Sequence, residues 1–257
     1  MTEQTTQKKY ELLKDDTVEH FGRTLYRIKA LITFGLVGAG QLGGYIETEK
    51  NLDHSGNAWV YDNARVCGDA CVYGNAGVYD NAWVYGNARV YGNARVYDNA
   101  WVYGNARVYG NARVYGKAWV FGNACVYGNA GVYGKAWVFG NAWVFGDARV
   151  YGDACVYGNA GVCGDARVYD IARVFGDARV RSFAVISERK MIFWASNVGS
   201  ENGTLTVFNG KFGLIVTRGC FTGTVDEFLS KSKEVHDDKT HHEYKLLIEV
   251  AQSRILN

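Results

Sequence analysis

The sequence predicts an all-β solenoid of stacked triangular coils, and two observations lead to this prediction. From Asn57 to Ser182 the chain repeats the hexad Asn-Ala-x-Val-Tyr-Gly without an insertion, so that these 126 residues divide into twenty-one copies. Short fixed periods of this kind are typical of β-helix solenoids. Proline is absent from all 257 residues, as suits a chain that consists mainly of paired strands.

Each hexad is expected to form one short strand and one corner. Because side chains alternate between the two faces of a strand, Ala and Val point inward, while x and the aromatic residue point outward. The pair Gly-Asn, replaced in some copies by Asp-Asn or Gly-Asp, accepts the positive φ that a corner requires. Three hexads make one triangular coil, so the repeat predicts about seven coils and ~30 Å of stacked strands.

Segments of different composition flank the repeat and are expected to cap it, because a solenoid needs ends that block further strand addition. The predicted divisions are an N-terminal β cap at 1–56, the β-helix at 57–187, and a C-terminal cap of strands and two helices at 188–257. The first helix is expected to begin at the capping box Thr224–Glu227, and the second to cover about 239–256.

The hexads resemble the hexapeptide-repeat family, in which an aliphatic residue is followed four positions later by a small one, as Val108 is by Ala112. More narrowly, the chain is similar to YdcK-like hexapeptide-repeat proteins of bacteria and their phages, in the repeat and in Gly38–Ile46 and Arg218–Phe228. The resemblance implies a left-handed parallel β-helix. Members of this family are often described as transferases on the basis of their fold, and fold alone does not determine function.

Residues eighteen apart are expected to stack, which separates the outer surface into three faces of different chemistry. The Trp face carries the large rings that are expected to form a homo-oligomer interface, namely Trp83, Trp101, Trp119, Trp137, Phe121 and Phe139. Monomers seldom expose more than ~300–600 Å² of apolar surface in one patch, so we expect a second subunit or the C-terminal helices to cover this face. Alternatively, the stacked rings only favour strand register.

The Arg/Tyr face pairs a column of arginines with a column of tyrosines. The residues expected to bind a ligand are Arg95, Arg113, Gly131, Arg149, Arg167, Tyr115, Tyr133 and Tyr151. Guanidinium groups bind phosphate or carboxylate and stack on flat rings. Gly131 interrupts the arginine column and leaves a notch ~9–10 Å across, which predicts a site for a planar anion such as a nucleotide. Alternatively, the arginines only keep a strand face soluble.

Several classes of protein are excluded. A net charge of +2 provides no basic field for sequence-specific DNA binding, and no run of eighteen apolar residues could span a membrane. The six cysteines lack the spacing of disulfide frameworks or zinc sites, and Met1–Glu11 lacks the apolar core of a signal peptide. We therefore expect a cytoplasmic protein with reduced thiols, without a metal or cofactor. Cys220 is expected to be a buried structural thiol.

Histidine is absent from the repeat, although His54 precedes it and His236 follows it. The family resemblance implies that acyltransferases of this fold use a histidine base, so we expect no catalytic residue. The predicted function is a non-enzymatic, oligomeric ligand-binding scaffold for an anionic small molecule or a host protein. By analogy with phage accessory proteins, it would sequester a host immune signal or block host defence. The alternatives are a hexapeptide-class acyltransferase and a purely structural or polymer-forming protein.

Overall fold

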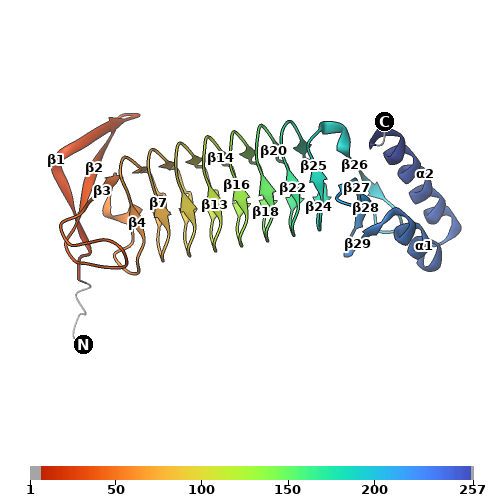
Figure 1. Ribbon diagram of the computed structural model, residues 1–257, viewed down its shortest axis with the longest axis horizontal. Coiled ribbons are helices and arrows are strands. Elements are labelled where there is room, and N and C mark those ends of the chain that lie inside the picture. The colour runs from red at the N-terminus through yellow and green to blue at the C-terminus, as the bar shows by residue number, and fades with distance from the viewer. Residues whose placement is uncertain (1–6, 256–257) are drawn as a thin grey trace. The chain divides into compact units, whose positions relative to one another are not determined.

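The computed structural model describes residues 7–255, which form two compact units divided between Asn129 and Ala130. The first unit contains the N-terminal cap and the earlier coils, and the second contains the later coils and the C-terminal cap (Figure 1). The chain makes about eight solenoid turns with parallel strands. The predicted parallel β-solenoid with capped ends is therefore confirmed.

Solenoid strands of the first unit are two residues long and consist of x and Val of each hexad. They are β4 (Trp59–Val60), β5 (Arg65–Val66), β6 (Cys71–Val72), β7 (Gly77–Val78), β8 (Trp83–Val84), β9 (Arg89–Val90), β10 (Arg95–Val96), β11 (Trp101–Val102), β12 (Arg107–Val108), β13 (Arg113–Val114), β14 (Trp119–Val120) and β15 (Cys125–Val126). Parallel partners lie eighteen residues apart. The orders are β5-β8-β11-β14 on the Trp face, β4-β7-β10-β13 on the Arg/Tyr face and β6-β9-β12-β15 on the third face.

Valine and alanine fill the interior of the coils, as the alternation predicts. Val102, Val108 and Val114 are all 0% exposed. The corners have positive φ at Gly or Asp, for example 70° at Gly92 and 60° at Asp98. Corner asparagines also hydrogen-bond from coil to coil; the Asn75 Nδ2 donates to Asn93 Oδ1 at 3.2 Å, and other Asn–Asn pairs of the first unit repeat this contact. The repeat is therefore joined by backbone ladders and by side-chain ladders.

The N-terminal cap begins with an antiparallel hairpin of β1 (Tyr10–His20) and β2 (Arg23–Ala30). Strand β3 (Leu42–Ile46) runs antiparallel to β2 and parallel to β5. Leu52 then forms a parallel bridge with Val72. The strand positions of β3 and Leu52 precede the hexads, and Val185–Ile186 follows them, so three positions are added to the twenty-one of the hexads. This explains why there are about eight turns where the hexad count predicts seven.

Buried aromatic side chains close the open end of this first turn. Tyr10 and Trp59 are both 0% exposed, and the ring of Phe34 lies edge-on to Trp59 at 5.4 Å. The Tyr10 hydroxyl donates to the carbonyl oxygen of Leu52 at 2.7 Å. The Lys9 Nζ donates to the carbonyl oxygen of Ala58 at 2.9 Å, and burial lowers the pKa of Lys9 to about 8. This packing leaves the first coil with a covered end, so the predicted capping role of the segment has a physical basis.

Strands of the second unit continue the same pattern and end in a four-stranded antiparallel sheet. The solenoid strands are β16 (Gly131–Val132), β17 (Trp137–Val138), β18 (Trp143–Val144), β19 (Arg149–Val150), β20 (Cys155–Val156), β21 (Gly161–Val162), β22 (Arg167–Val168), β23 (Arg173–Val174), β24 (Arg179–Val180) and β25 (Val185–Ile186). After the 3₁₀ helix η2 (Arg189–Met191) come β26 (Ile192–Val198), β27 (Gly203–Gly210), β28 (Gly213–Arg218) and β29 (Phe221–Thr224), which pair in this order.

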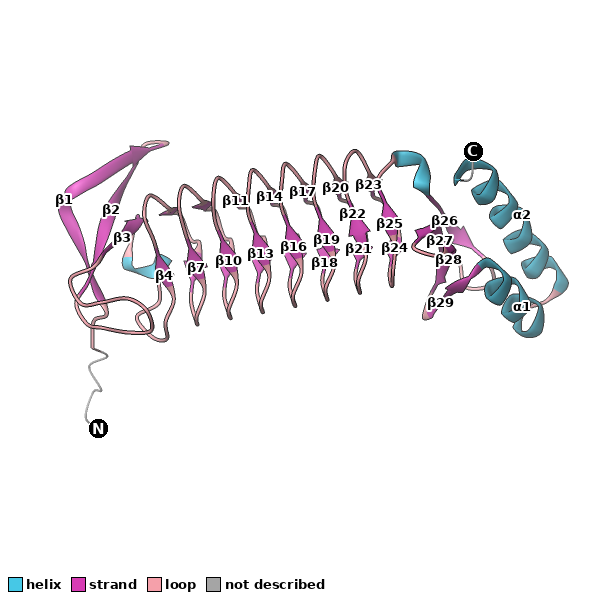
Figure 2. Ribbon diagram, viewed as in Figure 1, coloured by secondary structure: helices cyan, strands magenta, loops and turns pink. Residues whose placement is uncertain are grey.

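Helices α1 (Val225–Val235) and α2 (Asp238–Ile255) pack on the antiparallel sheet (Figure 2). The predicted capping box is present, since Thr224 N donates to Glu227 Oε2 at 2.7 Å and Glu227 N donates to Thr224 Oγ1 at 3.3 Å. Residue 256, expected as the end of α2, lies outside the described residues. The expected burial of Cys220 is wrong, because this thiol is exposed between β28 and β29.

Candidate ligand site

The first unit brings Arg95 and Arg113 of the Arg/Tyr face into direct register on β10 and β13. Both side chains are exposed. Tyr115, which follows Arg113 on the same face, stacks on Tyr97 with ring centroids 4.7 Å apart. The three ligand-binding residues predicted in this unit therefore belong to one continuous strand surface.

The second unit contains the other five residues predicted for this face. Gly131 pairs with Arg149, and Arg149 pairs with Arg167. Tyr133 stacks on Tyr151 at 4.9 Å. A Cβ atom at Gly131 would meet only the Tyr133 ring, at an ordinary contact distance of 3.6 Å. Space for a side chain therefore exists at Gly131, while the ligand notch at this glycine stays a prediction.

A pocket of about 490 Å³ opens on the Arg/Tyr face of the first unit. Its lining is Leu36, Tyr61, Tyr79, Asp80, Arg95, Tyr97 and Arg113. Arg95 and Arg113 are among the predicted site residues. Leu36 was not predicted, since it comes from the loop between β2 and β3, outside the repeat. Asp80 was also missed, although it is a recognisable corner residue.

The tyrosine column changes its spacing at this pocket. The rings of Tyr61 and Tyr79 stack closely, with centroids 4.3 Å apart and planes 7° apart. Tyr97 stacks on Tyr115, but within residues 7–255 no ring contact joins Tyr79 to Tyr97. On the third face of the same unit, by contrast, every ring stacks on the next at 4.8–4.9 Å, through Tyr73, Tyr91, Tyr109 and Tyr127. The column of the Arg/Tyr face is therefore interrupted.

Gly77 accounts for the position of the Tyr79 ring. These two residues lie on the same side of the strand, one on each side of Val78. A Cβ atom at Gly77 would lie 2.3 Å from the Tyr79 ring, so this ring occupies the space that a side chain at Gly77 would need. Gly77 is accordingly buried, although x is exposed in the arginine hexads that follow.

The charges around the pocket favour an anion. Neither Arg95 nor Arg113 forms an ion pair or a side-chain hydrogen bond with any residue in the described part of the chain. Burial raises the pKa of Tyr61 to about 12, and it also raises the pKa of Tyr97, so both phenols keep their protons at neutral pH. The Asp80 Oδ2 already accepts a hydrogen bond from Asp98 N at 3.1 Å. The Tyr61 hydroxyl already interacts with that of Tyr79, so two free guanidiniums and the Tyr97 phenol face one partly engaged carboxylate.

A second pocket on the same face, in the second unit, has a related composition. It has a volume of about 500 Å³ and is lined by Tyr151, Asp165, Arg167, Tyr169, Phe183, Ala184, Val185 and Lys211. Two of these residues, Tyr151 and Arg167, are predicted site residues. Lys211 lies in the turn between β27 and β28, so its contribution depends on the C-terminal cap and not on the repeat.

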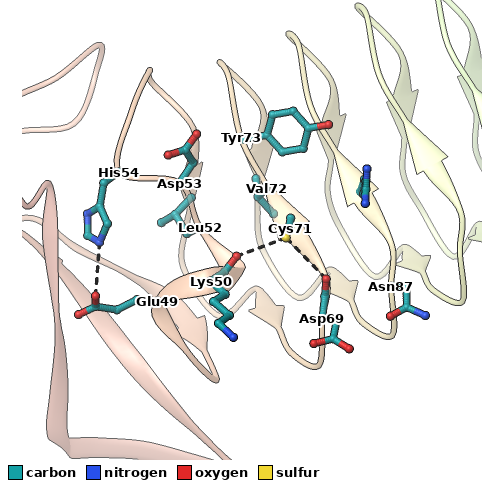
Figure 3. Close-up of a pocket in the computed structure, with 11 residues that line it drawn as sticks. Glu49, Lys50, Leu52, Asp53, His54, Asp69, Cys71, Val72, Tyr73 and Asn87 are labelled. Carbon is teal, nitrogen blue, oxygen red and sulfur yellow. Dashed lines mark hydrogen bonds and ion pairs between the residues drawn. The ribbon is translucent and has the colours of Figure 1, made fainter. Parts of the chain in front are cut away.

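The pocket beside the N-terminal cap has a different chemistry (Figure 3). Its volume is about 730 Å³, and it is lined by Glu49, Lys50, Leu52, Asp53, His54, Asp69, Cys71, Val72, Tyr73, Asn87 and Arg89. The His54 ring stacks on Tyr10 at 4.3 Å, its Nδ1 accepts from Lys9 N at 3.1 Å, and its Nε2 lies 3.7 Å from a Glu49 oxygen. This histidine therefore holds the cap together. No cluster of metal-ligating side chains occurs within residues 7–255.

The Trp face is partly covered by a segment from outside the repeat, which the periodicity did not predict. The ring of His20, at the tip of the β1–β2 hairpin, lies 3.7 Å from the Trp83 ring, which is 8% exposed. Trp101 and Trp119 stack at 5.2 Å and are half-buried, while Trp137 in the second unit is 42% exposed. The C-terminal helices pack on the antiparallel sheet of that unit and leave Trp137 open.

The two phenylalanines of this face extend its ring columns. Phe121 stacks on Tyr103 at 4.9 Å, and Phe139 stacks on Tyr157 at 4.9 Å. Whether these rings also lie in an oligomer interface stays a prediction.

The parallel coils with inward Val and Ala define a β-solenoid protein. A family model described as the YdcK β-solenoid repeat matches residues 88–104, 106–122 and 148–164. These matches and the parallel coils fit a YdcK-like repeat β-helix protein, so the resemblance seen in the sequence is confirmed. No curated protein matches the chain. Within the described residues, no helix is long and apolar enough to cross a membrane.

Proposed function

We propose that this protein is a non-enzymatic binding scaffold whose Arg/Tyr face holds a flat anionic ligand of the nucleotide type. The pocket of the first unit carries the proposal. There, Arg95 and Arg113 are free of protein partners and stand beside a group of tyrosine rings. Phosphate or carboxylate oxygens would accept from the guanidiniums, and an aromatic part of the ligand would contact the rings.

The free state of the two arginines is what makes them suitable for a ligand. An arginine already paired with a carboxylate would have to give up that partner to bind a ligand. These two side chains would have to release only bound water. A hydrogen bond to a charged group contributes ~1.5–3 kcal/mol, so the loss of one arginine should weaken binding by about tenfold or more. Exposure to solvent places the expected effect at the lower end of this range.

Titration calorimetry with a panel of nucleoside phosphates tests the proposal. Arg95→Ala and Arg113→Ala are expected to weaken binding about tenfold each and to make it less sensitive to salt. Arg107→Ala is the matched control, because Arg107 occupies the same exposed hexad position on the third face. Equal affinities for all three variants would mean that the arginines are only a solvated strand surface, and no binding of any nucleotide would refute the proposed function.

We also propose that a second copy of the chain covers Trp101 and Trp119, so that the scaffold is a homo-oligomer. The stacked indoles are half-buried within the protomer and leave apolar ring surface open. Light scattering should give the mass of an oligomer for the unmutated protein and of a monomer for the Trp101→Glu, Trp119→Glu double variant. A monomeric unmutated protein would refute this part of the proposal.

A further inference from the structure

We infer that the pocket of the first unit binds its ligand by inserting a flat ring between Tyr79 and Tyr97, so that the ligand is a nucleoside phosphate and not merely an anion. This inference rests on the proposed function and specifies the ligand class at the same site. It comes from the interruption of the tyrosine column, which coincides with the pocket.

An uninterrupted column of rings has no room for a ligand ring. Its spacing follows the strands of a sheet, ~4.8 Å, whereas two stacking contacts with an inserted ring need ~7–8 Å between the flanking planes. On the Arg/Tyr face, Tyr79 lies on Gly77 and close to Tyr61, at 4.3 Å. The ring has moved away from Tyr97, and the pocket lies where the regular column would have continued.

Polar groups around the interruption match the parts of a nucleoside phosphate. Arg95 and Arg113 belong to the coils of Tyr97 and Tyr115, so a phosphate bound to them would lie beside the inserted ring. Asp80 is unsuited to phosphate, but its carboxylate can accept from a sugar hydroxyl or from an amino group of a base. Leu36, which is 96% exposed, adds an apolar wall at the cap side of the pocket.

Gly77→Ala tests the binding of the ligand's aromatic ring separately from the binding of its phosphate. The new Cβ atom would lie 2.3 Å from the end of the flexible Tyr79 side chain, which must therefore move off Gly77. Its regular position stacks on Tyr97, so the variant is expected to restore the column and close the space for a ligand ring. The arginines are unchanged in this variant.

Titration calorimetry should compare adenosine monophosphate with ribose 5-phosphate, which has the same sugar and phosphate but no aromatic base. The unmutated protein is expected to bind adenosine monophosphate at least tenfold more tightly, as stacking on aromatic side chains implies. In Gly77→Ala and Tyr97→Leu this preference should disappear, while the affinity of Gly77→Ala for ribose 5-phosphate stays the same. Tyr109→Leu, in the uninterrupted ring column of the third face, should leave both affinities unchanged.

The outcomes separate the two proposals. Equal affinities of the unmutated protein for both compounds would overturn ring insertion and leave the anion-binding function standing. Binding of neither compound would overturn both. A preference for adenosine monophosphate that survives in Gly77→Ala and in Tyr97→Leu would also overturn ring insertion, because the ring would then lie elsewhere.

Discussion

Two glycines of the repeat have opposite surroundings, so the same substitution should change stability in opposite directions. Gly110 forms a corner with φ +71°, and a Cβ atom there would lie 3.0 Å from Gly128 N and 3.2 Å from Gly128 O. Gly131 lies in strand β16, where a Cβ atom would make only an ordinary 3.6 Å contact with Tyr133. We expect Gly110→Ala to destabilise the protein and Gly131→Ala to stabilise it slightly.

The magnitudes follow from backbone conformation and crowding. A left-handed conformation costs an L-residue such as alanine roughly 1–2 kcal/mol. The 3.0 Å contact adds to this cost, because its partner is backbone that takes part in the coil-to-coil ladder; Asn111 N donates to Gly128 O at 2.8 Å. Any Gly→Ala change also lowers the conformational entropy of the unfolded chain, and this stabilises the folded protein by about 0.4–1 kcal/mol. Gly110→Ala should thus lose about 1–2 kcal/mol, and Gly131→Ala should gain about 0.4–1 kcal/mol.

Urea unfolding followed by circular dichroism provides the measurement. The midpoint should fall for Gly110→Ala and rise for Gly131→Ala, with the slope unchanged. Gly110→Asp is a useful control, since aspartate occupies the same kind of corner at Asp98 with φ 60°. It should therefore destabilise less than alanine does. A Gly110→Ala midpoint equal to or above that of the unmutated protein would refute the reasoning about the corners.

Three further outcomes are expected. Val108→Ala should cost about 2 kcal/mol through the cavity that it leaves, whereas Val235→Ala, at a position that is 54% exposed, should cost far less in the same urea titration. Thr224→Ala should remove the capping box of α1 and cost ~1 kcal/mol, measured in the same way. For His20, desolvation and the charge of Arg65 lower the pKa below 6.5, so its neutral form stabilises the folded protein above that pH, and this contribution is lost as the pH falls through the folded-state pKa. An NMR titration of His20 should show this low pKa, and Arg65→Ala should raise it.

The coils were predictable because each hexad contains its own structural information. Val and Ala alternate with outward residues, and Gly or Asp marks the corner of every hexad but the last, which ends at Ser182, so strand, face and bend follow from six consecutive residues. The extra turn was not predictable in this way. It uses β3 and Leu52, whose segments lack the hexad pattern and join the coils through long-range contacts such as the pairing of β3 with β5 and of Leu52 with Val72.

In the candidate site, too, some side-chain positions could be predicted from the sequence and others could not. Arg95 and Arg113 could be assigned to one face by counting residues, because the strand period sets the direction of a side chain. The notch expected at Gly131 and the pocket near Gly77 both involve a glycine at position x. They differ because the Tyr79 ring lies on Gly77, whereas the Tyr133 ring stacks regularly on Tyr151 and would lie 3.6 Å from a Cβ atom at Gly131.

The sequence by itself determined the parallel coils, the buried Val and Ala, the three outer faces and the capping box at Thr224, since all of these depend on neighbours within a few residues or on a constant period. Only the tertiary structure decided that His20 covers Trp83, that Leu36 reaches the Arg/Tyr face, and that the tyrosine column is interrupted after Tyr79. These contacts join residues with no periodic relation, and the rotamer of each ring depends on the space that its neighbours leave.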